Sequence, residues 1–238
     1  MCKLITLDST PSTNGWLREH IAELSHGTAI TAIEQTDGRG RRGNVWLGNG
    51  GMLPLSVLLK GVPHPETVTL CAAVAVCRVL ERECGCSCGI KWPNDIIICE
   101  RKVCGILCES VWKGDSISVV VGVGVNLTQP QDYFETAGIP YGGSLEMFAK
   151  APDREHITLS LAEALREYCM MSFEELSAEY RERCLTLGRQ VRIIGANGER
   201  TAFATDLDDG GRLVCEDKTE RFVVNSGEVS VRGLLGYI

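Results

Sequence analysis

Three arginines stand among three glycines in residues 38–43, which read Gly-Arg-Gly-Arg-Arg-Gly. A β-rich run at residues 28–34 ends just before this segment. In α/β proteins, ligands bind in loops that leave the ends of strands. The segment therefore favours an α/β sheet that carries a ligand-binding loop at a strand end.

The rest of the chain is acidic. It has 238 residues, 44% hydrophobic and 23% charged, with a formal net charge of -7. An acidic body repels nucleic acid, so a local basic loop suits a small anion better than a DNA surface. The sequence has no long apolar run that could act as a secretory or membrane segment. We therefore expect no nucleic-acid partner, no membrane partner and a cytoplasmic location.

The chain contains twelve cysteines and four histidines. A chain of this size with ample core residues does not need a disulfide framework. No Cys-x-x-Cys pair occurs, and the histidines lack metal-ligand spacing. We expect reduced thiols and no metal site built from protein side chains.

Hydrophobic periodicity predicts an α/β (α+β) fold in which helices flank a mixed sheet. The predicted strands cover residues 28–34, 52–59, 90–92, 96–99, 103–109 and 117–123, and the predicted helices residues 12–24, 68–80, 154–169 and 173–184. Residues 100–102 are predicted as the tip of the hairpin between two of these strands.

The composition changes near residue 187. From there on, turn signals such as residues 208–211 (Asp-Asp-Gly-Gly) recur every ten or so residues, which is typical of short strands in a small β-barrel. The sequence thus predicts a large domain over residues 1–186 and a β-barrel over residues 187–238.

The arginine loop has the chemistry needed to join a carboxylate to ATP, two groups that repel each other. Arg39, Arg41 and Arg42 can bind both anions through paired donors, and the glycines between them let backbone N–H groups approach the same oxygens. The alternative is a mobile, solvated basic loop with no ligand.

Two further motifs follow the loop. Lys91 precedes Trp-Pro-Asn-Asp, a turn that holds the lysine at a strand end where it can meet developing phosphate charge. An ordinary exposed strand lysine is the alternative. Gly122-Val-Gly124 lacks the third glycine of a dinucleotide fingerprint, so it favours close backbone approach, with Asn126 able to bond an adenine or ribose edge.

In order and spacing, these motifs closely resemble the catalytic domain of biotin–protein ligases, from about Ser12 to the C-terminus. The resemblance implies a C-terminal SH3-like β-barrel and Lys91 and Arg41 as catalytic residues. It implies the following biotin-binding residues: Ser12, Thr13, Asn14, Gln35, Gly38, Arg39, Gly40, Arg41 and Lys91. It also implies ATP-binding residues: Arg41, Arg42, Trp46, Lys91 and Asn126.

The sequence departs from the family at Asn44, where relatives usually have a further arginine before the tryptophan. The chain also starts eleven residues before Ser12, which predicts a monofunctional ligase without the winged-helix domain that lets some relatives repress transcription.

The resemblance implies that biotin and ATP are the substrates and that Mg²⁺ is held by phosphates and water. Biotin is activated to biotinyl-5′-AMP and passed to a lysine on a biotin carrier domain, such as that of acetyl-CoA carboxylase. A weak homodimer through sheet edges is also implied. Two alternatives are a lipoate–protein ligase and a biotin-sensing transcriptional regulator.

Overall fold

In the computed structural model, residues 3–47, 50–114, 116–195, 198–226, 230–233 and 237 are described. The larger part contains the following elements: β1 (Leu4–Thr10), α1 (Thr13–Glu19), β2 (Ala29–Gln35), the 3-10 turn η1 (Arg41–Gly43), β3 (Met52–Lys60), α2 (Val68–Cys84), β4 (Gly89–Lys91), β5 (Asp95–Ile98), β6 (Arg101–Lys113), β7 (Ser116–Asn126), α3 (Gln131–Thr136), the 3-10 turn η2 (Leu145–Met147), α4 (Arg154–Tyr168) and α5 (Phe173–Arg183).

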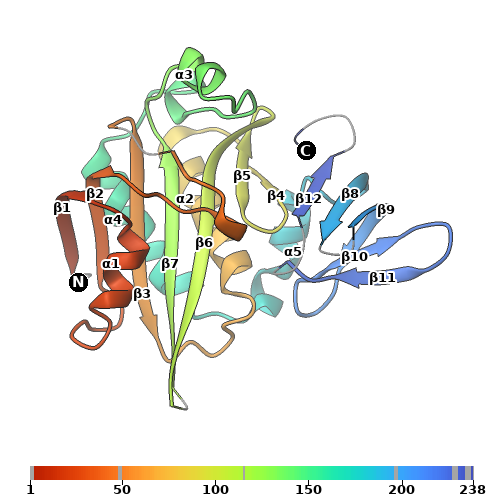
Figure 1. Ribbon diagram of the computed structural model, residues 1–238, viewed down its shortest axis with the longest axis horizontal. Coiled ribbons are helices and arrows are strands. Elements are labelled where there is room, and N and C mark those ends of the chain that lie inside the picture. The colour runs from red at the N-terminus through yellow and green to blue at the C-terminus, as the bar shows by residue number, and fades with distance from the viewer. Residues whose placement is uncertain are drawn as a thin grey trace.

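Seven strands form one mixed sheet in the order β1-β2-β3-β7-β6-β5-β4. β1 and β2 are parallel, and the other neighbours are antiparallel. Helices α2 and α4 pack on one face of this sheet and α1 on the other (Figure 1). This is the predicted arrangement of a mixed sheet flanked by helices.

The core follows from these two faces. Eight of the nine residues of β3 are buried, because this central strand is covered on both sides. Helix α2 is apolar nearly all round, as its sequence predicts, and Val74, Ala75 and Val76 are fully buried within it. Leu17 of α1 forms a separate small cluster with Ile30 of β2 on the opposite face. Among the helices within the described ranges, none is long and apolar enough to cross a bilayer.

The C-terminal part is a small antiparallel sheet in the order β11-β10-β9-β8-β12. Its strands are β8 (Arg189–Gly195), β9 (Gly198–Leu207), β10 (Leu213–Glu216), β11 (Arg221–Val224) and β12 (Ser230–Gly233). Two of its contacts with the larger part meet at Gly211. The indole of Trp92 donates to Gly211 O at 3.0 Å. A Cβ on Gly211 would lie 1.9 Å from Leu70 Cδ1, so only glycine permits this approach.

Strand β1 and the short helix α3 were not predicted, and two local predictions were wrong. Helix α1 ends at Glu19 and not at Leu24, although Ile21 and Leu24 still pack on the Leu17 cluster from a following turn. The tight turn between β5 and β6 lies at Cys99 and Glu100, whose φ angles are 46° and 64°. Residues 101–102 therefore belong to β6 and not to the hairpin tip.

Candidate active site

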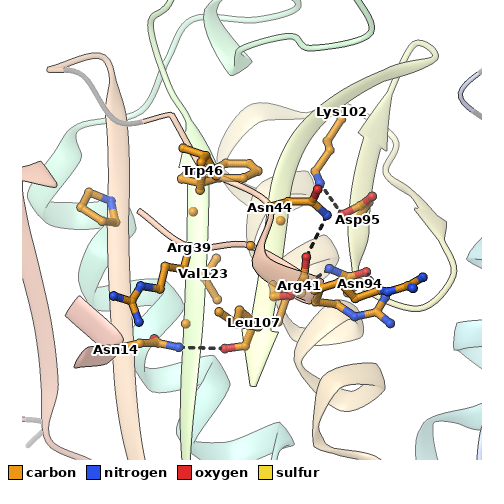
Figure 2. Close-up of a pocket in the computed structure, with 18 of the residues that line it drawn as sticks. Asn14, Arg39, Arg41, Asn44, Trp46, Asn94, Asp95, Lys102, Leu107 and Val123 are labelled. Atoms are coloured by element: carbon orange, nitrogen blue, oxygen red, sulfur yellow. Dashed lines mark hydrogen bonds and ion pairs between the residues drawn. The ribbon is translucent and has the colours of Figure 1, made fainter. Parts of the chain in front are cut away.

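A cavity of about 200 Å³ opens between the N-terminus of α1, the arginine loop and strands β4 to β7. Figure 2 shows its walls, with Asn14 and Arg39 near one end and Asp95 and Lys102 near the other. Most of the predicted site residues line it: Ser12, Thr13, Asn14, Gln35, Arg39, Gly40, Arg41, Arg42, Trp46 and Lys91. Asn126 lines a hollow of about 530 Å³ beside it, and both hollows share Trp46.

One end of the cavity is a neutral hydrogen-bond network. Gln35 Oε1 accepts from the backbone N–H of Thr13 at 2.9 Å and from its hydroxyl at 3.1 Å. The Ser56 hydroxyl contacts Thr13 Oγ1 at 2.8 Å and Asn14 Oδ1 at 2.6 Å. These four side chains are buried, so their mutual bonds fix the rotamers that face the cavity. We call them the neutral cluster.

The helix start and a strand glycine set the position of Asn14. Ser12 caps α1 by accepting from Gly15 N at 3.2 Å. Asn14 Nδ2 donates to Leu107 O at 3.2 Å and to Glu109 Oε2 at 2.8 Å. A Cβ on Gly122 would lie 2.2 Å from Asn14 Oδ1. The predicted close approach at Gly122 is thus made by the Asn14 side chain.

The arginine loop folds back on itself. Trp46 N donates to Gly38 O at 2.9 Å, and Gly40 N donates to Asn44 O at 2.7 Å. Asn44 also closes the tip, because its side chain donates to Arg41 O at 2.8 Å. Gly38 lies behind the cavity wall, where a Cβ would sit 2.3 Å from Trp46 O. The loop is therefore a compact hairpin, and Asn44 holds its turn.

The three arginines take different directions. Arg39 is exposed and pairs with Asp37 at 2.8 Å. Arg41 is half-buried and donates to Asn94 Oδ1 at 3.0 Å and to Ser226 O. Burial lowers the pKa of its guanidinium, and Asp95 opposes that shift. Arg42 reaches the C-terminal sheet and donates to Ile194 O at 3.1 Å. Only Arg41 thus combines burial with a place in the cavity.

Lys91 ends strand β4 and is 6% exposed. Its ammonium lies over the ring of Tyr237, 3.4 Å from the ring centroid. Burial lowers the pKa of Lys91 to about 8; Asp95 raises it, and Lys102 and Arg232 lower it further. The alternative of an ordinary exposed strand lysine is therefore wrong. A buried ammonium with a lowered pKa is stabilised by an arriving anion.

Trp46 lies flat on two glycines that pair across β6 and β7. A Cβ on Gly124 would lie 2.5 Å from Trp46 Nε1, and one on Gly105 2.8 Å from its Cζ3. Larger residues at these two positions would push the indole off the sheet. The glycine at 124, predicted from sequence to allow close approach, thus seats the aromatic ring of the site.

Asn126 is already engaged by the protein. Its amide donates to Gly143 O at 2.9 Å and to Lys102 O at 3.4 Å, and its oxygen accepts from Gln129 at 3.3 Å. In this arrangement Asn126 ties strand β6 to the loop before η2.

Sequence reasoning missed several polar residues in or beside the cavity, among them Ser56, Asp95, Lys102 and Tyr237. Ser56 is the one polar residue in the apolar interior of β3, a signal that could have been found. Asp95, Lys102 and Tyr237 meet only in three dimensions: Lys102 Nζ lies 2.5 Å from Asp95 Oδ1, and the Tyr237 hydroxyl donates to Asp95 Oδ2. We call Lys91, Asp95 and Lys102 the charged cluster.

The described part of the chain contains no group of three or more His, Cys, Asp or Glu that could hold a metal ion. Its cysteines are free thiols.

The cavity has a neutral end with fixed hydrogen-bonding groups and a cationic end suited to an anion.

Comparisons with known proteins agree with this geometry. The sequence pattern of the Biotin/lipoate A/B protein ligase family matches residues 4–126, and that of the Biotin protein ligase C terminal domain matches residues 186–232. The first match alone spans more than half of the 238 residues. The chain belongs to this ligase family.

Individual relatives narrow the assignment within the family. A biotin--[acetyl-CoA-carboxylase] ligase of Mycobacterium tuberculosis is 31% identical over 241 residues, covering 95% of this chain and 88% of that protein. The bifunctional ligase/repressor BirA of Bacillus spizizenii is 35% identical over 201 residues, covering 80% of this chain. The chain spans 62% of that relative's length.

Among solved structures, the biotin protein ligase from Aquifex aeolicus in complex with biotin and ATP matches with a TM-score of 0.82 and 28% identity. The match covers 98% of this chain and 100% of that one. The predicted fold class and the predicted place among biotin–protein ligases are confirmed. These relatives are named for biotin, so the lipoate alternative is not favoured.

Proposed function

We propose that this ligase joins the carboxylate of biotin to the α-phosphate of ATP and then transfers the biotinyl group to a lysine of a carboxylase biotin carrier domain. The observation that carries the proposal is one cavity with two unlike ends. The neutral cluster is suited to an uncharged ring with N–H and C=O groups, and Arg41 and Lys91 are suited to anions.

In this proposal, biotin lies with its ring against Ser12, Thr13, Asn14 and Gln35 and with its carboxylate toward the arginine loop. Arg39 and the backbone of Gly40 close that side, and Gly38 supports the loop from behind the cavity wall. Lys91 and Arg41 contact the carboxylate and the α-phosphate together, which offsets their repulsion as the new bond forms. Trp46, Arg42 and Asn126 form the nucleotide side.

Adenylation needs no side-chain nucleophile. A carboxylate oxygen of biotin attacks the α-phosphorus, and pyrophosphate leaves with the electron pair of the broken P–O bond. The acceptor lysine then attacks the biotinyl carbonyl carbon and AMP leaves. Mg²⁺ would be held by the phosphates of ATP and by water, and would neutralise part of the phosphate charge.

We further assign residues 1–186 to the catalytic domain and residues 187–238 to a C-terminal SH3-like domain. The bond from Trp92 to Gly211 and the contacts of Arg41 and Arg42 with the C-terminal part support a role of that domain in closing the site. A cytoplasmic location and a weak homodimer stay predictions.

The test is incubation with a biotin carrier domain, ATP and either biotin or lipoate, followed by intact mass of the carrier. We expect one biotinyl group on the carrier and no lipoyl group. Modification by lipoate and not by biotin would transfer the chain to the lipoate ligases.

A further inference from the structure

The backbone of Lys102 forms a parallel β-bridge with Gly142 in the loop before η2. Its N–H donates to Tyr141 O at 2.8 Å, and its carbonyl accepts from Gly143 N at 3.0 Å. The Asn126 amide donates to the same carbonyl at 3.4 Å. The loop before η2 and the end of β7 therefore fix the starting point of this side chain.

The side chain of Lys102 lies where the two hollows meet. It lines both the main cavity and the hollow that contains Asn126. Its ammonium lies 5.2 Å from the ring centroid of Trp46 and 2.5 Å from Asp95 Oδ1 (Figure 2). At this distance the pair is both an ion pair and a hydrogen bond. An ammonium has three N–H donors, so Lys102 can bind Asp95 and a ligand at the same time.

The charged cluster carries an excess of positive charge. Burial alone raises the pKa of Asp95, but Lys102, Tyr237 and Lys91 together bring it below its usual value, so the carboxylate is ionised. One carboxylate faces two ammonium groups, and Arg232 adds a further cation on the cavity wall. A polyanion placed here would neutralise that excess.

We propose that Lys102 is a further catalytic residue, which binds the phosphates of the nucleotide where the two hollows join, and that Asp95 positions it beside Lys91. The inference rests on the proposed function. Lys91 contacts the α-phosphate and the biotin carboxylate. Lys102 stabilises the negative charge that grows on the departing pyrophosphate. This role transfers no proton and breaks no bond of Lys102, so no further reactant is needed.

The first test measures biotin-dependent ATP–pyrophosphate exchange in Lys102→Met, Lys102→Arg and a matched control, Lys113→Met. Lys113 is exposed at the far end of the same strand. We expect Lys102→Met to lose about 10²-fold in kcat/KM for ATP. Lys102→Arg should recover most of that loss, and the control should match the native protein. The affinity for biotin in the absence of nucleotide, measured by calorimetry, should change by no more than about twofold in Lys102→Met. No phosphate is then present for Lys102 to contact.

The second test is the pH profile, which reports how strongly the charges of Asp95 and Lys102 act on Lys91. The groups that face Lys91 are Asp95, Lys102, Arg232 and the Tyr237 ring. Asp95 raises the pKa of Lys91 and Lys102 lowers it. Asp95→Asn should therefore move the alkaline limb of kcat/KM to lower pH. In Lys102→Met, the alkaline limb of the remaining kcat/KM should move to higher pH.

The outcomes separate the two claims. No exchange by the native protein with biotin would overturn the proposed function itself. Normal exchange by the native protein together with near-native kcat/KM for ATP in Lys102→Met would overturn the role of Lys102 alone. An equal loss in Lys102→Met and Lys102→Arg, with a lowered melting temperature and an equal loss of biotin affinity without nucleotide, would reduce the pair to a structural one.

Discussion

The two ends of the cavity are built on opposite principles. In the neutral cluster, Thr13, Gln35 and Ser56 satisfy one another through short hydrogen bonds within the larger sheet and α1. At the cationic end, Arg41 and Lys91 take their partners from distant segments, Ser226 and Tyr237. The first end is held together by neighbouring side chains, whereas the second holds its charges against groups from distant parts of the chain.

This difference has a physical reason. Neutral polar groups can be buried at little cost when each finds a partner, so a rigid pocket for an uncharged ring is stable by itself. Several cations in one cavity repel each other and lose hydration. In the free protein, contacts with Ser226 and Tyr237 in the C-terminal part stabilise Arg41 and Lys91. The neutral end should therefore govern which acid binds, and the cationic end how fast it is activated.

The largest effect should come from Lys91→Ala, which removes the most buried cation of the site. Losing one preorganised electrostatic contact costs about 10²–10³ in rate. Adenylate formation, measured in single turnover, should fall by at least that order, while circular dichroism stays native. Near-normal adenylation by this variant would remove the cationic end from the chemistry.

Arg41→Gly should have the next largest effect. A hydrogen bond to a charged group is worth about 1.5–3 kcal/mol, so the adenylate should escape roughly 10–10²-fold faster. Released adenylate should then label lysines of unrelated added proteins, detected by streptavidin blot. Trypsin should also cut the native loop more slowly with biotin and ATP than without them. The idea of a clamp fails if stray labelling is absent and cleavage is the same in both states.

The third prediction concerns pH. In the free protein Lys91 has a pKa of about 8, because burial disfavours its charged form. The ammonium is present below that pH and is lost above it, so kcat/KM for biotin should fall about tenfold per pH unit beyond 8. Bound phosphate favours the charged form, so the alkaline limb of kcat should lie higher than that of kcat/KM. Parallel limbs above about pH 10 would mean that Lys91 behaves as an ordinary lysine.

The smallest effect should come from Ser56→Ala in the neutral cluster. This change leaves Thr13 and Asn14 without the hydroxyl that joins them, a loss of about 1 kcal/mol and roughly a fivefold weaker affinity for biotin. The KM for ATP should be unchanged. Calorimetry with biotin and exchange kinetics with varied ATP measure the two quantities separately. A larger change for ATP than for biotin would contradict the division of labour between the ends.

The sequence was informative where a motif is local. The arginine loop, Lys91 before its proline turn and the glycines of β7 were all predicted, because each depends on neighbouring residues. Lys102 was assigned to a hairpin tip because its charged neighbours resemble a turn. The turn in fact falls on Cys99 and Glu100, which adopt left-handed backbone conformations. Cysteine and glutamate rarely adopt this conformation, so the sequence did not indicate a turn there.

Other features depend on contacts distant in sequence. Strand β1 has few buried residues and forms only by pairing with β2, so its own pattern carries a weak signal. Arg39 and Arg41 were both expected to bind the ligand, but the exposed Arg39 side chain forms an ion pair with Asp37. The bond from Arg41 to Ser226 joins residues far apart in the sequence, so only the fold shows it. Position in a motif predicted which residues surround the cavity, and not which of them face inward.

The most direct test of the central claim, that one cavity joins an acid selected at its neutral end to a phosphate held at its cationic end, is ATP–pyrophosphate exchange with biotin, with lipoate and with no acid. We predict exchange with biotin only, strongly reduced by Lys91→Ala. Exchange without any acid, exchange with lipoate in place of biotin, or full exchange by Lys91→Ala would contradict it.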